Sequence, residues 1–253
     1  MRISDILKKK KTFSFEVFPP NSEQSKISDI YGTIDSLQQY NPDFISVTFK
    51  SSGNYSQNTI DLASYIQSNS NAEPLVHFTC GALDNHDVDQ LITTLQQAKL
   101  ENILALRGDR PTDFEGNYLQ YFKHASELME YLRERGDFCL AGACYAEGHI
   151  ECSSLYEDLI NLKIKQEKGA SFFISQLFYD NNYYYRLVRA AKKMGITIPI
   201  IPGIMPLTSS KMFNKIMNMA GASIPFELRV LFDRFQDDKR AMYEIGIAYS
   251  VNQ

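Results

Sequence analysis

The sequence predicts an α/β fold, a (β/α)8 TIM barrel whose last strand is missing from this chain. Three observations lead to this prediction. Short apolar runs alternate with amphipathic, helix-like segments, as in a series of βα repeats. The glycine-rich motifs with which open parallel sheets bind nucleotides do not occur in the sequence. Polar residues stand near the ends of most apolar runs, and a barrel gathers all such ends into one ring.

Seven apolar runs have the composition of strands that are covered on both faces, as the strands of a parallel sheet are. They are residues 12–18, 44–49, 74–80, 102–108, 139–145, 172–178 and 198–204. The polar residues near their carboxyl ends are Glu16, Thr48, His77, Asp109, Tyr145 and Gln176.

Segments in which apolar residues recur at helical spacing lie between these runs, for example residues 25–40 and 87–100. Residues 157–169 form another such segment, which ends at Gly169, a natural helix stop. After the seventh run, the remaining segments are helical in character. They are residues 209–220, 225–235 and 238–253. A barrel closes only when its last strand pairs with its first. We therefore expect either a shortened chain or two sheet edges that something else covers.

The bulk composition is that of an ordinary globular protein. The 253 residues carry a net charge of −4, and 44% of them are hydrophobic, so we expect one domain spanning residues 1–253 and no nucleic-acid or membrane surface. The lysine run 8–11 is interpreted as a solvated face. No signal peptide or run of about 20 apolar residues is found, which predicts a cytoplasmic protein.

The four cysteines are Cys80, Cys139, Cys144 and Cys152, and none belongs to a C-x-x-C pair. We expect free, mostly buried thiols in a reducing compartment. Cys144, His149 and Cys152 match no standard zinc spacing, so no metal site is predicted.

Glu16 lies in "FSFEVFPP", residues 13–20, where an apolar strand stops at two prolines. In an apolar pocket, the pKa of a carboxyl group rises and the group can donate a proton. The alternative is an ion pair with a basic residue across the barrel. The flanking aromatic residues and the two prolines favour the catalytic interpretation.

Asp109 follows Gly108 in "ALRGDRP", residues 105–111, at the end of the fourth run. There it could accept hydrogen bonds from the N–H groups of a heterocycle, or it could simply cap a turn.

Asp158, Asn161 and Lys165 have the spacing of one helix face. Such a face suits a ribose and a diphosphate, but a plain solvated helix surface has the same pattern.

Gln176 lies in a run rich in Phe and Ile, where a buried amide would need partners that a heterocyclic ligand offers. Tyr145 and His149, in "CYAEGHIE", could stack on or hydrogen-bond to a ring system.

Taken in order, these segments resemble the bacterial type of flavin-dependent methylenetetrahydrofolate reductases, from residue 12 to about residue 250. The most specific matches are "FSFEVFPP" and "LALRGDRP", and the others are "ISVTF", "HFTC", "CYAEGHIE", "DLINLKIK", "ASFFISQLFYD" and "IPIIPGIMP". The resemblance implies a barrel that binds FAD at its rim, takes hydride from NADH or NADPH, reduces a folate, and forms homo-oligomers.

The resemblance also implies roles for single residues. Glu16 is expected to be the general acid that assists opening of the folate ring, Asp109 to tune the flavin, and Gln176 to hold the pterin. The positions that match FAD contacts are Thr48, His77, Arg107, Gly108, Asp109, Tyr145, His149, Asp158, Asn161 and Lys165.

Three features depart from the family pattern. Ile164 stands where many bacterial members have a second cation, and Ser210 lies where they often have an aromatic residue. The chain also stops before the family's last strand. The missing strand and Ser210 motivate an alternative, a weakly active or inactive barrel that serves as a partner subunit. A third hypothesis, a lyase with Lys50 as its Schiff-base amine, lacks a glycine loop for phosphate.

Overall fold

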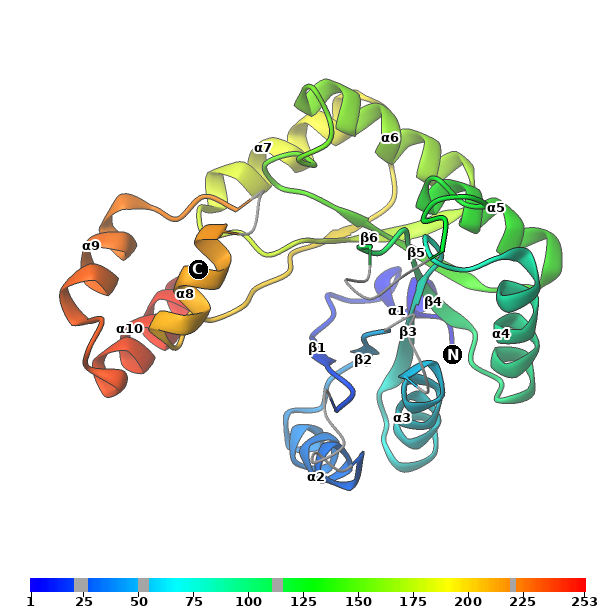
Figure 1. Cartoon of the computed structure of the whole chain (residues 1–253), viewed down its shortest axis with the longest axis horizontal. Coiled ribbons are helices and arrows are strands. Elements are labelled where there is room, and N and C mark those ends of the chain that lie inside the picture. Colours follow the sequence, from blue (N-terminus) through cyan, green and yellow to red (C-terminus); the bar gives the residue numbers. More distant parts are fainter. Residues whose placement is uncertain (21–26, 50–54, 111–115, 219–221) are drawn as a thin grey trace. The chain divides into compact units, whose positions relative to one another are not determined.

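The structure, a computed structural model, describes residues 1–20, 27–49, 55–110, 116–218 and 222–253 (Figure 1). The chain divides into two compact units. Unit 1 comprises Met1–Gly142 and Lys165–Phe172, and unit 2 comprises Ala143–Ile164 and Phe173–Gln253. The expectation of a single domain stays a prediction, and each unit is described by itself below.

Seven strands follow one another in the sheet in chain order. They are β1 (Ser14–Val17), β2 (Phe44–Val47), β3 (Glu73–Thr79), β4 (Asn102–Leu106), β5 (Cys139–Cys144), β6 (Ala170–Ser175) and β7 (Ile200–Ile201). The pairs from β1 to β5 are parallel, and so is the pair of β6 with β7. Each predicted run overlaps one strand, and no eighth strand occurs in the described part of the chain. The predicted α/β class with a missing strand is therefore confirmed.

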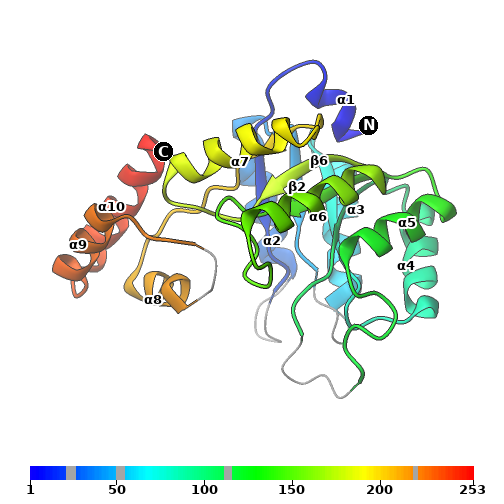
Figure 2. The ribbon, with the colours of Figure 1, turned by 90° about the horizontal axis from the view of Figure 1, so that it is seen from above.

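Helices alternate with the strands as predicted (Figure 2). Their bounds are α1 (Ile3–Leu7), α2 (Ile27–Leu37) with the 3₁₀ turn η1 (Gln38–Tyr40), α3 (Tyr55–Asn69), α4 (Asn85–Gln97), α5 (Ala125–Arg135), α6 (Leu155–Glu167), α7 (Asn181–Lys193), α8 (Ser210–Asn218), α9 (Phe226–Phe235) and α10 (Lys239–Asn252). None of the helices described is long and apolar enough to cross a membrane.

In unit 1, β2 is buried along its whole length, as expected for an interior strand of a parallel sheet. Helices α4 and α5 lie side by side in both views and are joined by an ion pair from Arg135 Nε to Asp89 Oδ1 at 2.9 Å.

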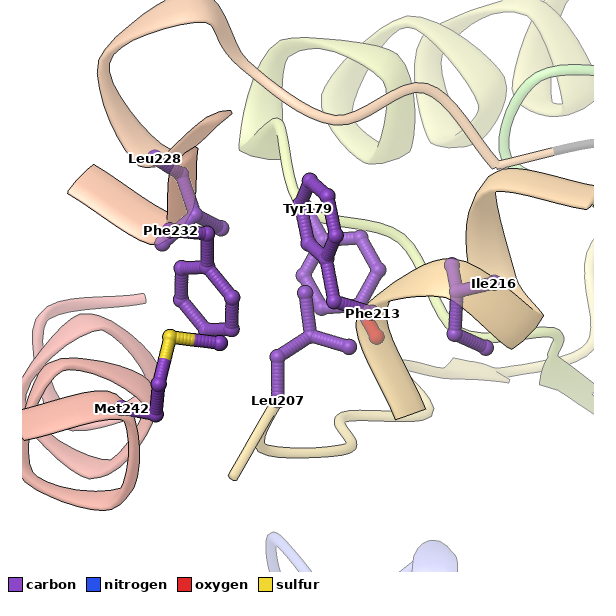
Figure 3. Close-up of a cluster of buried hydrophobic side chains, with 7 residues drawn as sticks. All are labelled: Tyr179, Leu207, Phe213, Ile216, Leu228, Phe232 and Met242. Carbon is purple, nitrogen blue, oxygen red and sulfur yellow. The ribbon is translucent and has the colours of Figure 1, made fainter. Parts of the chain in front are cut away.

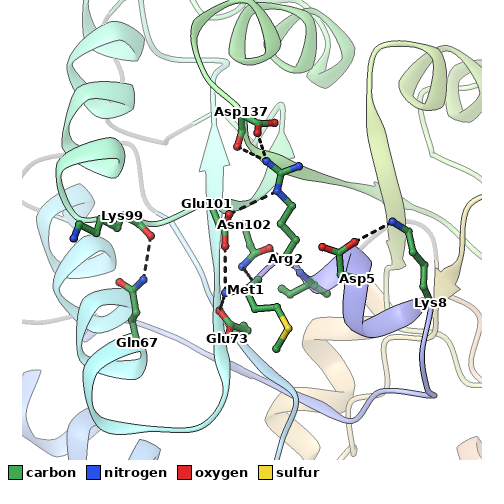
Figure 4. A network of polar contacts seen from close by, with 11 residues as sticks. Met1, Arg2, Asp5, Lys8, Gln67, Glu73, Lys99, Glu101, Asn102 and Asp137 are labelled. Carbon is green, nitrogen blue, oxygen red and sulfur yellow. Dashed lines mark hydrogen bonds and ion pairs between the residues drawn. The ribbon is translucent and has the colours of Figure 1, made fainter.

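At the start of β4, the buried Asn102 accepts a hydrogen bond from Ile3 N at 2.9 Å and donates one to the Met1 carbonyl at 3.1 Å (Figure 4). These bonds fix α1 against the amino ends of the strands. Lys8 directly follows α1, is exposed, and pairs with Asp5. This fits the interpretation of the lysine run as a solvated face.

In unit 2, the last three helices enclose an apolar cluster (Figure 3). Its buried members are Tyr179, Leu207, Phe213, Ile216, Leu228, Phe232 and Met242. Ser210 Oγ donates to the Gln236 carbonyl at 2.6 Å and so ties the start of α8 to the end of α9. Helix α10 lies directly on the backbone at Leu207, since a Cβ on Gly246 would clash with the Leu207 carbonyl oxygen.

Candidate functional site

The candidate residues are described in two groups, one around Glu16 and one in and after the loop that follows β5. The first group is centred on Glu16 in β1, whose side chain is 44% exposed. Parallel pairing sets Glu16 opposite Ser46, and the Ser46 hydroxyl donates to Glu16 Oε2 at 3.2 Å. On the next strand, the buried His77 places Nε2 3.4 Å from the same carboxylate oxygen. The structure thus brings two predicted site residues together around a serine hydroxyl that sequence reasoning missed.

The pKa of Glu16 lies below its ordinary value, which corrects our expectation of a raised pKa. Partial burial raises the pKa, but the interactions with His77 and the Ser46 hydroxyl favour the carboxylate and outweigh it. The expectation failed because the apolar neighbours in sequence point away from the carboxyl group, while the groups that touch it come from β2 and β3.

His77 is 7% exposed, and its Nε2 has no hydrogen-bond partner among the described residues, since the contact to Glu16 is outside hydrogen-bond geometry. A buried polar atom without a partner is rare in folded proteins and often marks a functional position.

The turn after β4 is tightly built around Gly108, which has a φ of +80°. A Cβ at this position would lie 2.8 Å from Thr79 Cβ, so the turn has no room for a side chain. The Tyr118 hydroxyl donates to the Gly108 carbonyl and fixes the turn from the other side. Asp109 follows and is exposed, as expected for a residue presented at a strand end.

Thr48 and Arg107 belong to the same unit. Thr48 N donates to the Val17 carbonyl, which extends the pairing of β1 with β2 beyond the strands, and the Arg107 carbonyl accepts from Gly81 N. The backbone at both positions is therefore fixed next to the strand ends.

The second group lies in the loop after β5, residues 145–154. The rings of Tyr145 and His149 meet edge to face, with centroids 4.6 Å apart. Between them, Gly148 has a φ of +94° and donates from its N–H to the Tyr145 carbonyl, closing a turn. The loop therefore places both predicted ring-binding residues side by side.

Asp158 holds this loop to α6. It is 4% exposed, and its Oδ2 accepts from His149 N at 3.2 Å. Asn161 Nδ2 donates to Cys152 Sγ at 3.5 Å, and Lys165 is half-buried in the last turn of the same helix. The predicted helix face is thus partly an anchor for the loop. Nothing in the sequence spacing distinguishes an anchoring Asp from one that touches a ligand.

Gln176 differs from its predicted setting. Strand β6 ends at Ser175, and Gln176 is exposed, with its own Oε1 accepting from Leu177 N at 2.9 Å. The expectation of a buried amide is therefore wrong, because β6 ends three residues before the end of the apolar run.

Among the remaining candidates, Lys50 lies outside the described residues. Cys80, Cys139 and Cys144 are buried and Cys152 is half-buried, and the four cysteines are thiols outside disulfides, as expected. Within the described ranges, no group of three or more His, Cys, Asp or Glu side chains has the arrangement of a metal site.

The comparison with protein families identifies the family of the chain. The family model for methylenetetrahydrofolate reductase matches residues 2–253. The chain belongs to the methylenetetrahydrofolate reductase family. It is 32% identical over 252 residues to methylenetetrahydrofolate reductase (NADH) 1 of Arabidopsis thaliana, covering 94% of this chain and 42% of that protein. It is 32% identical over 233 residues to 5,10-methylenetetrahydrofolate reductase of Escherichia coli K12, covering 92% and 77%.

The chain thus spans about two fifths of the length of the plant and yeast reductases that it matches. Among solved structures, it is similar to an uncharacterized protein from Clostridium thermocellum that binds two copies of 5-methyl-5,6,7,8-tetrahydrofolic acid. The TM-score is 0.62 at 14% identity, covering 100% of this chain and 87% of that one. A deoxyribose-phosphate aldolase from Coccidioides immitis, described as putative, matches with a TM-score of 0.51 at 11% identity, covering 88% and 81%. These likenesses support the fold of this reductase family member.

Proposed function

We propose that this chain reduces 5,10-methylenetetrahydrofolate to 5-methyltetrahydrofolate, with FAD as its cofactor and NADH or NADPH as the hydride donor. The observation that carries the proposal is the half-exposed carboxyl group of Glu16 beside the buried His77, in a chain of this family. The residues of the site are proposed from their match to the family motifs.

The residues present fit a flat, polar heterocycle such as that of FAD. The buried His77 Nε2 lacks a hydrogen-bond partner among the described residues, and a ring system with polar edges would supply one. The turn at Gly108 has a positive φ, which favours glycine, and it is followed by the exposed Asp109. When bound, FAD supplies the hydride chemistry, and the protein supplies position and charge.

The residues proposed to hold the cofactor are those that match FAD contacts of the family. They are Thr48, His77, Arg107, Gly108, Asp109, Tyr145, His149, Asp158, Asn161 and Lys165. Because Asp158 is buried and bonded to the loop, we assign it the task of fixing His149. Asp109 is exposed and contributes a negative charge, and Gln176 offers an amide for the pterin.

Glu16 is proposed as the proton donor. Opening the five-membered ring of the folate requires protonation of the departing nitrogen. In the protein as described, Glu16 has a lowered pKa and is ionised at neutral pH. A substrate stacked over its exposed part would remove water from the carboxyl group and raise its pKa. We therefore propose that Glu16 takes up a proton as the folate binds and passes it to the nitrogen.

The test compares the wild type with Glu16→Gln under anaerobic conditions. We expect a yellow protein that is bleached by NADH or NADPH and reoxidised by methylenetetrahydrofolate. In Glu16→Gln, bleaching should persist, while reoxidation by the folate should slow by about two to four orders of magnitude. A colourless protein without affinity for FAD, or unchanged folate turnover in the variant, would contradict the proposal.

A second candidate is a partner subunit with little activity of its own. It is favoured by Ser210, whose hydroxyl is bonded within the helical cluster and offers no aromatic surface. If the isolated chain shows no turnover but migrates with a second protein in size-exclusion chromatography and gains activity, this candidate is the better description.

A further inference from the structure

The loop that carries Tyr145 and His149 is bound at its middle by a residue from far along the chain. Glu147 Oε1 accepts from Ser223 N at 2.7 Å, and Glu147 Oε2 accepts from the Ser223 hydroxyl. The backbone N–H and the hydroxyl of one serine therefore donate to the two oxygens of one carboxylate. Hydrogen bonds to a charged acceptor, made in pairs, fix geometry more strongly than single neutral ones.

The backbone around Ser223 is held by packing and can therefore anchor the loop. It lies in the connection between α8 and α9, and its neighbours Ala222 and Ile224 both pack against the apolar cluster of unit 2. The serine itself is exposed, so its side chain and N–H are free to point outward to Glu147.

The loop is already anchored at both ends. Tyr145 directly follows β5, and His149 N is held by Asp158. Glu147 lies between these points, beside Gly148, which has no side chain and therefore more accessible backbone conformations than other residues. Without the bond to Ser223, the middle of the loop has the freedom to change the angle between the two rings.

We propose that Glu147 is a positioning residue, which through its paired bond to Ser223 holds Tyr145 and His149 in the arrangement that binds the flavin cofactor. This rests on the proposed function in one respect, the identity of the ligand. It links the cofactor loop to the folding of α8 and α9, which supply no residue to the proposed FAD contacts.

The test uses Glu147→Ala, Ser223→Ala, the double variant and, as a matched control, Glu227→Gln, which removes an exposed carboxylate from the first turn of α9. FAD binding is measured by titration of the apoprotein. We expect the dissociation constant to rise about tenfold in Glu147→Ala and about threefold in Ser223→Ala, which retains the N–H donor. The double variant should match Glu147→Ala, and Glu227→Gln should match the wild type.

A second readout needs no cofactor. The chain has four histidines, so the imidazole nitrogens of His149 can be followed by NMR in the apoprotein. Its Nδ1 accepts from Glu151 N, and we expect this signal to shift or broaden in Glu147→Ala, with Ser223→Thr, which keeps the hydroxyl, resembling the wild type. Circular dichroism verifies that each variant is folded. If Glu147→Ala does not fold, Ser223→Ala and Ser223→Thr decide the question alone.

The outcomes separate the two proposals. If the wild type fails to bind FAD, the proposed function is wrong, while the NMR comparison still tests the positioning role. If the wild type binds FAD and Glu147→Ala changes neither the affinity nor the His149 signals, the positioning role is wrong. Weaker binding with unchanged His149 signals would also overturn it, because Glu147 would then act on the ligand directly.

Discussion

His77 Nε2 lies 3.4 Å from Glu16 Oε2, although the two residues come from strands that are separated by β2. The intervening strand contributes the Ser46 hydroxyl to the same oxygen. The contacts with His77 and Ser46 favour the charged form of the Glu16 carboxyl group. The first prediction follows from them.

The pKa of Glu16 should lie below its ordinary value of 4.5 in the apoprotein. Carboxyl ¹³C NMR measures it, with Glu16→Gln used to assign the signal. Ser46→Ala should move the pKa upward, because it removes a donor to the carboxylate. A measured pKa above the ordinary value would contradict the assigned role of His77 and Ser46.

The lowered pKa of Glu16 also predicts how the free energy of unfolding changes with pH. Because the folded-state pKa is lower than that of the unfolded chain, the carboxylate stabilises the folded protein above the unfolded pKa, and this contribution is lost as the pH falls through the folded pKa. In urea unfolding between about pH 6 and about pH 3, the wild type should therefore lose slightly more stability than Glu16→Gln. The difference is small because the side chain is 44% exposed.

Gly108→Ala should lower the free energy of unfolding by about 1–3 kcal/mol, because alanine disfavours a positive φ and its methyl group would press on Thr79. Gly32→Ala is the matched control. Gly32 lies in α2 with nothing near its missing side chain, so alanine there should stabilise the protein by up to about 1 kcal/mol. Urea titration measures the free energy of unfolding of both variants. Equal effects of the two substitutions would contradict the requirement for glycine at position 108.

Tyr179 and Tyr249 form a second matched pair. The Tyr179 hydroxyl is buried without a hydrogen-bond partner in the described structure, while the Tyr249 hydroxyl donates to the Tyr179 carbonyl. Tyr249→Phe should therefore destabilise the protein by about 1 kcal/mol, and Tyr179→Phe should leave stability unchanged or raise it by up to about 1 kcal/mol. Thermal unfolding of both variants tests this. A loss in Tyr179→Phe as large as in Tyr249→Phe would show that the Tyr179 hydroxyl has a partner.

The cysteines should react in a fixed order with iodoacetamide near neutral pH. Burial raises the pKa of Cys80 to about 12, so its thiolate is scarce, and its alkylation should require unfolding. Cys152 is half-buried, and burial and then the Asp158 carboxylate raise its pKa, so it should react slowly but first. Asp158→Asn should speed its alkylation, as read by peptide mass spectrometry. Alkylation of Cys80 before Cys152 in the folded protein would contradict the burial described.

The strands could be predicted from sequence because a parallel sheet covered on both faces needs continuous apolar runs, and such runs are visible without any knowledge of contacts. Their ends were less certain, as Gln176 shows, since flanking apolar residues continue after pairing stops. The short helix α1 was not predicted because five residues do not establish a helical period.

The ionisation of Glu16 was predicted in the wrong direction for a different reason. It depends on His77 and Ser46, which are remote in sequence and become neighbours only through strand pairing. Ser46 itself gave a usable signal, a polar residue inside an apolar run, and the parallel register would have placed it opposite Glu16. The bond between Glu147 and Ser223 left no such signal, because neither residue belongs to a periodic element.

The close packing of α10 against the Leu207 backbone constrains which helices from related proteins can replace α10. A chimera that imports the final helix from another member keeps its packing only if the donor sequence also has glycine at position 246, because any larger residue meets a carbonyl group that cannot retreat like a side chain. An exchanged helix must therefore have a hydrogen atom in place of a side chain at position 246, however well its apolar surface matches.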